Sequence, residues 1–314
     1  MTTFPEQPPS PGSSQPPSSP ASTGIEQVLV EDLCTPLPRG RRIFSGAMTA
    51  IALMLSVVAL VPLASVLVEI LRQGLPNLSL EVLVSLPAPQ GMENVQNGFG
   101  NAILGTVVMV GIAALVSVPL GVLTAIFLAE FGKTSTFASS TRFIITVMSG
   151  VPSIVVGVFA YGVIVLTTKQ FSAIAGAFAL AVVMLPIVVL STEEALKLVP
   201  MPQRLGSAAL GGNRFQTTWR IVVATSLPGI TTGVLLAIAR AAGETAPLIF
   251  TALFSQGWPS RLLSPTPSLS VLIYNYANSP FPEQNQLAWT ASLVLLMMIL
   301  AINILSRFVM RKTS

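Results

Sequence analysis

Long apolar runs separated by short polar segments set the pattern of this chain. Each of six runs holds at least the roughly 20 predominantly apolar residues that an α-helix needs to cross a bilayer. Backbone polar groups inside a bilayer must be paired within the segment, so each run predicts a helix. We therefore expect an all-α polytopic membrane protein with six transmembrane helices, at about residues 46–71, 101–131, 143–168, 171–198, 221–254 and 287–310.

The boundaries between the runs differ in strength. Only Lys169 and Gln170 separate the third run from the fourth. One helix over both runs would be about twice as long as a bilayer is thick, so the pattern predicts a tight turn here. The second and fifth runs are long enough to tilt or to extend past the membrane. Residues 193–220 form the main polar interruption, and we call this stretch the elbow.

Composition supports a membrane protein and excludes several kinds of chemistry. Of the 314 residues, 52% are hydrophobic and only 9% are charged, against about 25% charged in soluble domains. The chain has no histidine, and its single cysteine, Cys34, lies in a polar N-terminal segment. Disulfides, Cys/His metal sites and histidine-dependent catalysis are therefore excluded. The only aspartate, Asp32, lies outside the apolar runs, which excludes a transmembrane aspartyl dyad.

Residues 1–38 are rich in Pro, Ser, Thr and Gln and carry four acidic side chains but no Lys or Arg. Such a segment cannot bury enough apolar surface to offset the entropy lost on ordering. We expect residues 1–40 to form a disordered cytoplasmic tail and residues 41–314 to form the membrane domain. A tail that docks a partner is the alternative, although no residue pattern argues for it.

Lys and Arg are distributed unevenly between the two sides of the predicted bundle. With the N-terminus inside, the outer segments hold only Arg72, Lys169 and Arg261. Positive residues collect in cytoplasmic segments, so both termini and the elbow are expected in the cytoplasm. The twelve inner positions are Arg39, Arg41, Arg42, Lys133, Arg142, Lys197, Arg204, Arg214, Arg220, Arg307, Arg311 and Lys312.

A short helix is expected inside the elbow. Pro200 and Pro202 should end the preceding helix, because proline has no amide donor and disfavours helix in the residue before it. Residues 203–210 can then form a new helix, closed by Gly211 and Gly212. The elbow is therefore predicted to carry a surface helix, at about residues 203–213, between two spanning helices.

Arg240 and Glu244 are the charged pair embedded in the fifth run. They stand four residues apart and so share one face of a helix. An ionised side chain at this depth is costly unless it is paired or hydrated, and such residues mark transport pathways more often than not. Gly243 and Pro247 would loosen the helix and free backbone groups for a polar lining. The alternative is an ion pair that only fixes helix packing.

The elbow and its flanks also carry a resemblance to a known family. Aligned on Gly211, the elbow resembles the coupling loop of ABC-importer permeases, whose pattern is Glu-Ala-Ala, three residues, Gly, nine residues, Ile, one residue, Leu-Pro. Ile221 falls at the expected offset, whereas Leu205 stands in place of the usual Glu. Residues 192–196 (TEEAL), 239–247 (ARAAGETAP) and 267–275 (PSLSVLIYN) are similar to the A-type permeases of phosphate-specific (Pst) importers. These are inner-membrane components of binding-protein-dependent transport systems.

This resemblance implies a type I importer bundle that moves inorganic phosphate across the plasma (inner) membrane by alternating access. A second permease subunit, two ATPase subunits and an extracytoplasmic phosphate-binding protein are the implied partners. ATP and Mg belong to the ATPase subunits, and no cofactor or enzymatic activity is expected on this chain. Gly132-Lys133-Thr134 looks like the end of a P-loop, but Phe127 occupies the position of its first glycine.

The resemblance also assigns candidate residues. Arg240 and Glu244 would lie on the substrate pathway, where the arginine fork suits phosphate oxygens. Gly150, Pro152 and Ser153 break the third run and would face the pathway or the partner permease, with helix packing as the alternative. Gly243 and Pro247 would break the fifth. The ATPase-coupling residues would be Arg204, Leu205, Gly206, Ser207, Ala208, Ala209, Gly211 and Arg214, with the two arginines pairing with acids of the ATPase.

Other classes of protein fit the sequence less well. A secondary transporter needs an ion-coupling site of its own, and the runs offer one Arg–Glu pair with no Asp or His. An intramembrane enzyme lacks an HExxH motif and an aspartyl dyad. A sister permease for sulfate or molybdate is the serious alternative, and residues 239–247 argue for phosphate against it. No nucleic-acid partner is expected.

Overall fold

The computed structural model describes residues 39–89, 97–132 and 135–311, and the backbone alone of residues 305–311. All regular structure in these ranges is helical, so the predicted all-α architecture is confirmed. The predicted tail, apart from its last two residues, lies outside the described residues, as do Lys133 and Lys312. The chain divides into two units, Met1–Ala64 and Ser65–Ser314. Helix α2 (Arg39–Gly74) runs through the boundary between them.

The described spans agree with the six predicted runs. Five helical stretches are long and apolar enough to cross a membrane, and a bent pair makes a sixth if it counts as one span. The five are α2, α4 (Gly100–Ile126) with the π-helical turn η1 (Phe127–Phe131), α8 (Ala173–Lys197), Arg214–Ala242 and α14 (Pro282–Arg311). The stretch Arg214–Ala242 comprises α10 (Arg214–Thr217), η3 (Thr218–Val223) and α11 (Ala224–Ala242).

The bent pair is the third run, and its shape differs from one straight helix. Helix α5 (Thr136–Gly150) meets α6 (Ser153–Ala160) at 105° across a two-residue break. Pro152 has no amide proton and disfavours helix at Val151, which is extended with φ −72° and ψ 129°. After α6 the chain continues through η2 (Tyr161–Val165) and α7 (Leu166–Thr168). The third run therefore contains a corner.

A tight turn joins the third run to the fourth, as predicted. Lys169 adopts the left-handed conformation at φ 54°, which ends α7. The Ser172 hydroxyl accepts a hydrogen bond of 3.1 Å from the Ala175 amide and caps α8. A side-chain oxygen at this position satisfies one of the unpaired amides of the first turn.

The fifth run also differs from the prediction. Its helix ends at Ala242, and a new short helix, α12 (Ala246–Thr251), begins after a break. Pro247 stands in the first turn of α12, where a missing amide proton costs nothing. The prediction of a helix through residue 254 is therefore wrong, because the break at residues 243–245 divides the run.

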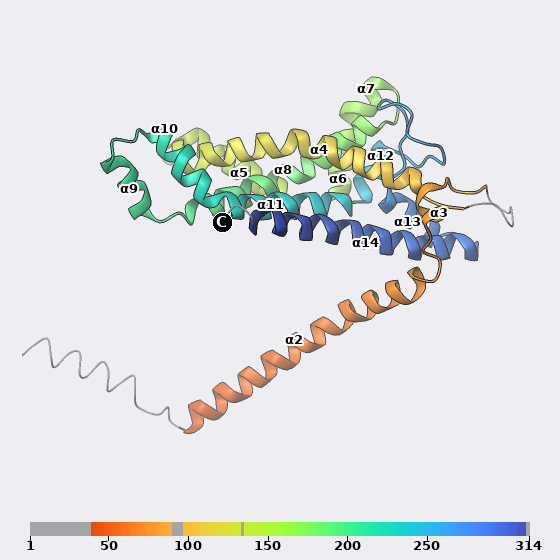
Figure 1. Ribbon diagram of the computed structural model, residues 1–314, viewed down its shortest axis with the longest axis horizontal. Coiled ribbons are helices and arrows are strands. Elements are labelled where there is room, and N and C mark those ends of the chain that lie inside the picture. The colour runs from red at the N-terminus through yellow and green to blue at the C-terminus, as the bar shows by residue number, and fades with distance from the viewer. Residues whose placement is uncertain (1–38, 90–96, 133–134, 312–314) are drawn as a thin grey trace, which may run out of the picture. The chain divides into compact units, whose positions relative to one another are not determined.

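Helix α8 forms the centre of the bundle and packs between α4 and α11 (Figure 1). Small residues allow these close contacts: a Cβ on Gly121 of α4 would lie 2.7 Å from a Val188 methyl. On α11, Gly229 and Gly233 lie against Ala195 and Ser191, and the Cβ–Cβ distance at Gly229 would be 2.8 Å. Small residues four apart are a common way to bring membrane helices together.

Two shorter helices, α3 (Leu80–Val84) and α13 (Leu269–Ala277), pack around the start of α4. Helix α13 is fixed to α4 because the Thr106 hydroxyl accepts a 2.9 Å hydrogen bond from the Leu269 amide. Helix α3 leads into α4, where Phe99 is fully buried with Leu269 and Leu272. These contacts hold the start of α4 in place.

Candidate functional site

The elbow contains a short helix, as predicted. Helix α9 (Met201–Ala209) begins directly after Pro200, with Pro202 in its first turn, so it starts two residues before the predicted position. The chain reverses at Gly211, whose φ of 80° favours glycine. A capping box between Asn213 and Gln216 then starts α10. The elbow thus contains two short helices, α9 and α10, joined by a tight turn at Gly211.

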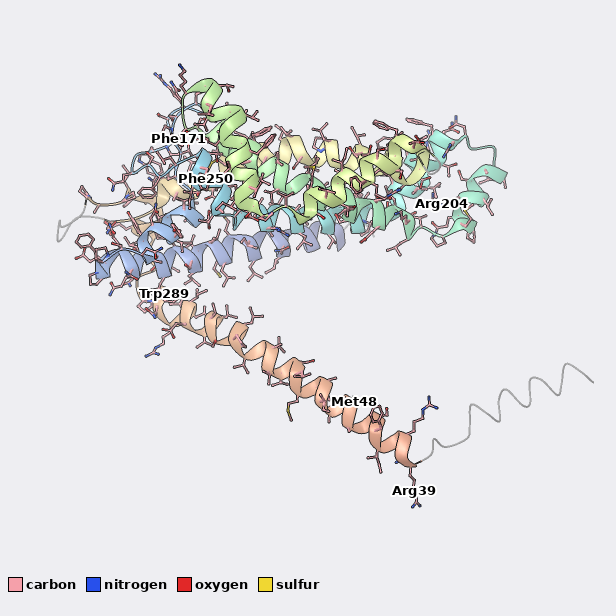
Figure 2. All side chains as sticks on the ribbon, turned by 180° about the vertical axis from the view of Figure 1, so that it is seen from behind. Arg39, Met48, Phe171, Arg204, Phe250 and Trp289 are labelled. Atoms are coloured by element: carbon pink, nitrogen blue, oxygen red, sulfur yellow. The ribbon has the colours of Figure 1, made fainter. Side chains whose placement is uncertain are left out.

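Arg204 is directed back into the molecule (Figure 2 labels it at the elbow). Its side chain is only 14% exposed and pairs with the Glu130 carboxylate through Nη1. Nη2 donates a 2.8 Å hydrogen bond to the Leu196 carbonyl, near the end of α8. Within the chain, Arg204 therefore pairs with Glu130. The pairing of Arg204 with an acid of a partner stays a prediction.

Arg214 makes its contacts on the same η1 turn. Its Nη2 donates to the Glu130 carbonyl oxygen, and its guanidinium carbon lies 5.3 Å from the centroid of the Phe131 ring. A cation over an aromatic face at this distance is attracted by the ring. Arg214 thus also bonds within the chain, and its predicted contact with a partner acid stays a prediction.

Small residues join the two short helices of the elbow. The Ser207 and Thr217 hydroxyls lie 2.8 Å apart and join α9 to α10. A cavity of about 300 Å³ between the two helices and η1 is lined by Ala208 and Gly212 among others. No atom lies within 4 Å of a Cβ placed on Gly206, so this position of α9 is open to the outside.

Several large apolar side chains are exposed on the elbow, among polar ones. Leu210 is 92% exposed, and Leu205 is exposed on α9 at the position where the resembled motif has an acid. Met201 and Phe215 are exposed on the same two short helices, and Ala209 is exposed beside them. Exposed apolar patches of this kind mark interaction sites.

Arg240 and Glu244 form the predicted ion pair. Arg240 Nε lies 3.5 Å from Glu244 Oε1, at the point where α11 ends. The two side chains differ in burial: Arg240 is 59% exposed, whereas Glu244 is 14% exposed. Ser270 of α13 donates a 2.8 Å hydrogen bond to the Glu244 carbonyl, which ties the break to its surroundings. The Arg240 guanidinium is thus accessible, whereas the Glu244 side chain is largely buried.

Arg240 also lines a cavity at the corner of the third run. This cavity has a volume of about 400 Å³ and lies between the α5–α6 corner and α8. Ser149, Val151 and Ser153 of the corner contribute to its wall, and Val183 and Pro186 of α8 contribute as well. The structure therefore brings Arg240 and Ser153 to one cavity, although they lie far apart in the sequence.

The glycines and prolines of the two breaks have different surroundings. A Cβ placed on Gly150 would have no atom within 4 Å, and one placed on Gly243 would have none closer than 3.6 Å, so neither glycine is required by close packing. Pro247 is buried, and its Cα would lie 2.7 Å from a Cβ on Gly157 of α6. Helix α12 therefore packs on α6 through Gly157, a contact that the sequence pattern did not indicate.

Two buried acids form ion pairs that the sequence pattern did not predict. Glu130 follows an apolar run, and its partner Arg204 lies 74 residues away, so no local pattern joins them. Glu193 is 2% exposed and binds Arg142 of α5 at 2.6 Å and Lys197 at 2.7 Å. The four-residue spacing of Glu193 and Lys197 was the available signal. No group of three potential metal ligands occurs among the described residues.

Solved structures with this arrangement define the class of fold. The bacterial alginate ABC transporter, solved with its pentasaccharide-bound periplasmic protein, superposes with a TM-score of 0.60. It is 14% identical, and the match covers 87% of this chain and 97% of that chain. An inward-facing structure of the MetNI methionine ABC transporter gives a TM-score of 0.54 at 16% identity, over 69% of this chain and 94% of that chain. The fold is that of the type I ABC-importer permeases.

Sequence comparison gives the family. Residues 117–314 match the model for the binding-protein-dependent transport system inner membrane component. The phosphate transport system permease protein PstA of Haemophilus influenzae is 40% identical over 268 residues, or 85% of this chain and 94% of that protein. PstA 1 of Mycobacterium tuberculosis strain H37Rv is 36% identical over 290 residues, or 89% and 92%. The chain belongs to this family of inner membrane transport components, among the PstA permeases. It is a multi-pass membrane protein and a transport permease subunit.

Proposed function

We propose that this chain is one of two permease subunits of an ATP-driven importer of inorganic phosphate in the plasma (inner) membrane. The assignment of phosphate as the cargo rests on one observation. The chain is 40% identical, over 85% of its length, to a relative named as a phosphate transport permease. Sulfate or molybdate as cargo is not favoured, because the relatives are named for phosphate. Ion-gradient coupling is not favoured either, because the fold is that of ABC importers.

The substrate pathway is proposed to pass Arg240. Its exposed guanidinium offers a planar fork of donors, which suits the oxygens of phosphate. Glu244 would hold that guanidinium when the pathway is empty, so that no permanent anion trap forms. The breaks at Gly150–Pro152–Ser153 and Gly243–Pro247 would leave backbone groups available to a polar lining, which is tolerated where irregular backbone lines a cavity.

The elbow is proposed to receive the ATPase. Two ATPase subunits would bind ATP and Mg, dock on the elbows of this chain and its partner permease, and displace α9 as they close. The exposed apolar residues Leu205 and Leu210 support a docking surface, and the partner groove should accordingly be apolar. An extracytoplasmic phosphate-binding protein would meet the outer loops, and alternating access would follow from the different affinities of these partners for two states. No catalysis is assigned to this chain.

The test is phosphate uptake by cells that carry the partner subunits. Arg240→Ala should lower uptake about 10- to 100-fold, since a hydrogen bond to a charged group contributes about 1.5–3 kcal/mol. Glu244→Gln should lower it as well, and both variants should still co-purify with the ATPase. Glu69→Gln, which removes an acid of α2 outside the elbow and the pathway, is the matched control and should behave as the native chain.

Unchanged uptake in both variants would reduce the Arg240–Glu244 pair to a packing contact. A native complex that hydrolyses ATP and moves no phosphate would overturn the cargo and leave the importer class in place.

A further inference from the structure

Glu130 is a buried acid at the end of a spanning helix, and the proposed function gives it no role. Its side chain is 8% exposed and lies in η1, the π-helical turn that ends α4. Turns of this kind occur often at functional sites. Here the turn faces the elbow, and Glu130 and Arg204 together line two cavities.

We infer that Glu130 is a positioning residue that fixes the coupling helix α9 to α4, so that a displacement of α9 reaches the helix bundle. The inference rests on the proposed function, in which the ATPase displaces α9. Glu130 itself touches neither phosphate nor ATP in this assignment. It acts through Arg204 and Arg214.

Arg204 connects three elements at one point. It extends from α9, pairs with the Glu130 carboxylate of η1, and donates to the carbonyls of Leu196 at 2.8 Å and Val199 at 3.4 Å. The pair is largely removed from water, with 8% and 14% of the two side chains exposed. Removal of one partner from such a pair leaves an uncompensated buried charge, so the connection resists separation.

Arg214 gives the same turn a second attachment from the other side of the elbow. It donates to the Glu130 carbonyl and lies over the Phe131 ring, while the Ser207–Thr217 contact joins α9 to α10. The elbow therefore has two arginine attachments on two consecutive residues of η1. A push on the exposed apolar residues of the elbow would then be received by the end of α4.

From α4 the contacts lead to the proposed pathway. Helix α4 packs on α8 at Gly121 and Val188, and α8 packs on α11 at Ala195 and Gly229. Helix α11 carries Arg240 at its far end. Coupling between the elbow and Arg240 needs an element that has two arrangements, each favoured by one of the two sites. We assign this part to the unit formed by α9, α10 and η1.

The experiment uses the assembled importer in proteoliposomes and measures phosphate imported per ATP hydrolysed. Glu130→Gln keeps the shape of the side chain and an acceptor oxygen while it removes the charge. It should lower phosphate per ATP about tenfold, within the usual range of coupling between sites, with the ATPase still bound. Arg204→Gln should give the same loss, and the double variant should be no worse than either single one, as expected of one shared contact. Glu69→Gln, which removes an acid of α2 outside the elbow, is the matched control.

A second readout does not depend on the cargo. Binding of a non-hydrolysable ATP analogue should change the hydrogen exchange of amides 127–131 in the native complex, and Glu130→Gln should abolish that change. If the native complex imports no phosphate, the proposed cargo fails, and this exchange readout still decides the inference. The inference is overturned if phosphate per ATP and the exchange response both stay native in Glu130→Gln. It is also overturned if both single variants lose the assembled complex, because Glu130 then serves folding alone.

Discussion

Glu193 is held by two cations of different exposure, and this difference decides how much each contributes at the residue scale. The Arg142 side chain is 39% exposed and the Lys197 side chain 56%, whereas that of Glu193 is 3% exposed. Arg142 binds through both Nε, at 3.0 Å, and Nη2, at 2.6 Å. A guanidinium with two donors on one carboxylate is a stronger partner than a solvated ammonium.

Glu193→Ala should therefore destabilise the protein more than Lys197→Ala. Loss of the buried acid should cost about 2 kcal/mol, below the 3–5 kcal/mol of fully buried pairs because Arg142 retains solvent. Loss of the exposed lysine should cost at most about 1 kcal/mol. Thermal unfolding of the purified protein in detergent measures both. Equal shifts in the melting temperature would contradict this ranking, because the exposed Lys197 would then contribute as much to stability as the buried Glu193.

At the scale of elements, Gly211 sets the path of the elbow. Its φ of 80° allows α9 to stop and α10 to begin three residues later, at Arg214. No atom lies within 4 Å of a Cβ at this position, so the need for glycine comes from the backbone alone. An L-residue in the left-handed region costs about 1–2 kcal/mol.

Gly211→Ala should therefore loosen the elbow without a steric clash. We expect the amides of residues 201–217 to exchange hydrogen about tenfold faster, as 1–2 kcal/mol of local destabilisation implies. Gly206→Ala is the matched control, because Gly206 lies inside α9 with open space around it and alanine is the better helix former. Faster exchange in Gly206→Ala than in Gly211→Ala would contradict the argument from φ.

The spanning helices were predictable because the bilayer leaves an apolar segment little choice of structure. The breaks were harder to place. Gly150–Pro152 and Gly243–Pro247 were recognised as helix-loosening, but proline and glycine are also tolerated inside membrane helices, as Pro119 in α4 and Pro186 in α8 show. The 105° corner and the end of α11 at Ala242 depend on packing between elements distant in sequence.

The candidate site was predictable only in part for the same reason. The Arg240–Glu244 pair is local, at four residues, and the structure contains it. The elbow helix is local as well, and its proline and glycine boundaries were readable. By contrast, Arg204 meets Glu130 across 74 residues. A long cationic side chain beside an apolar surface can point outward or inward, and the sequence pattern does not distinguish the two.

At the scale of the whole molecule, the uneven distribution of Lys and Arg predicts which side of the membrane each loop lies on. Arg72, Lys169 and Arg261 fall on the proposed outer side, against twelve Lys and Arg residues on the inner side. The elbow, with Lys197, Arg204, Arg214 and Arg220, is then expected to face the cytoplasm, where an ATPase can reach it. An inverted chain would present the elbow to the outside, and the proposed function would be impossible.

The single cysteine makes this topology measurable without any engineered label. Cys34 precedes the first span, so a membrane-impermeant maleimide should modify it in inside-out vesicles and leave it unmodified in intact cells. Cys34→Ser provides the blank. Cys34→Ser combined with Lys169→Cys reverses the pattern, because residue 169 is in the turn between α7 and α8 on the proposed outer side. Modification of Cys34 in intact cells would place the N-terminus outside and would require the ATPase, the elbow and the direction of transport to be reassigned together.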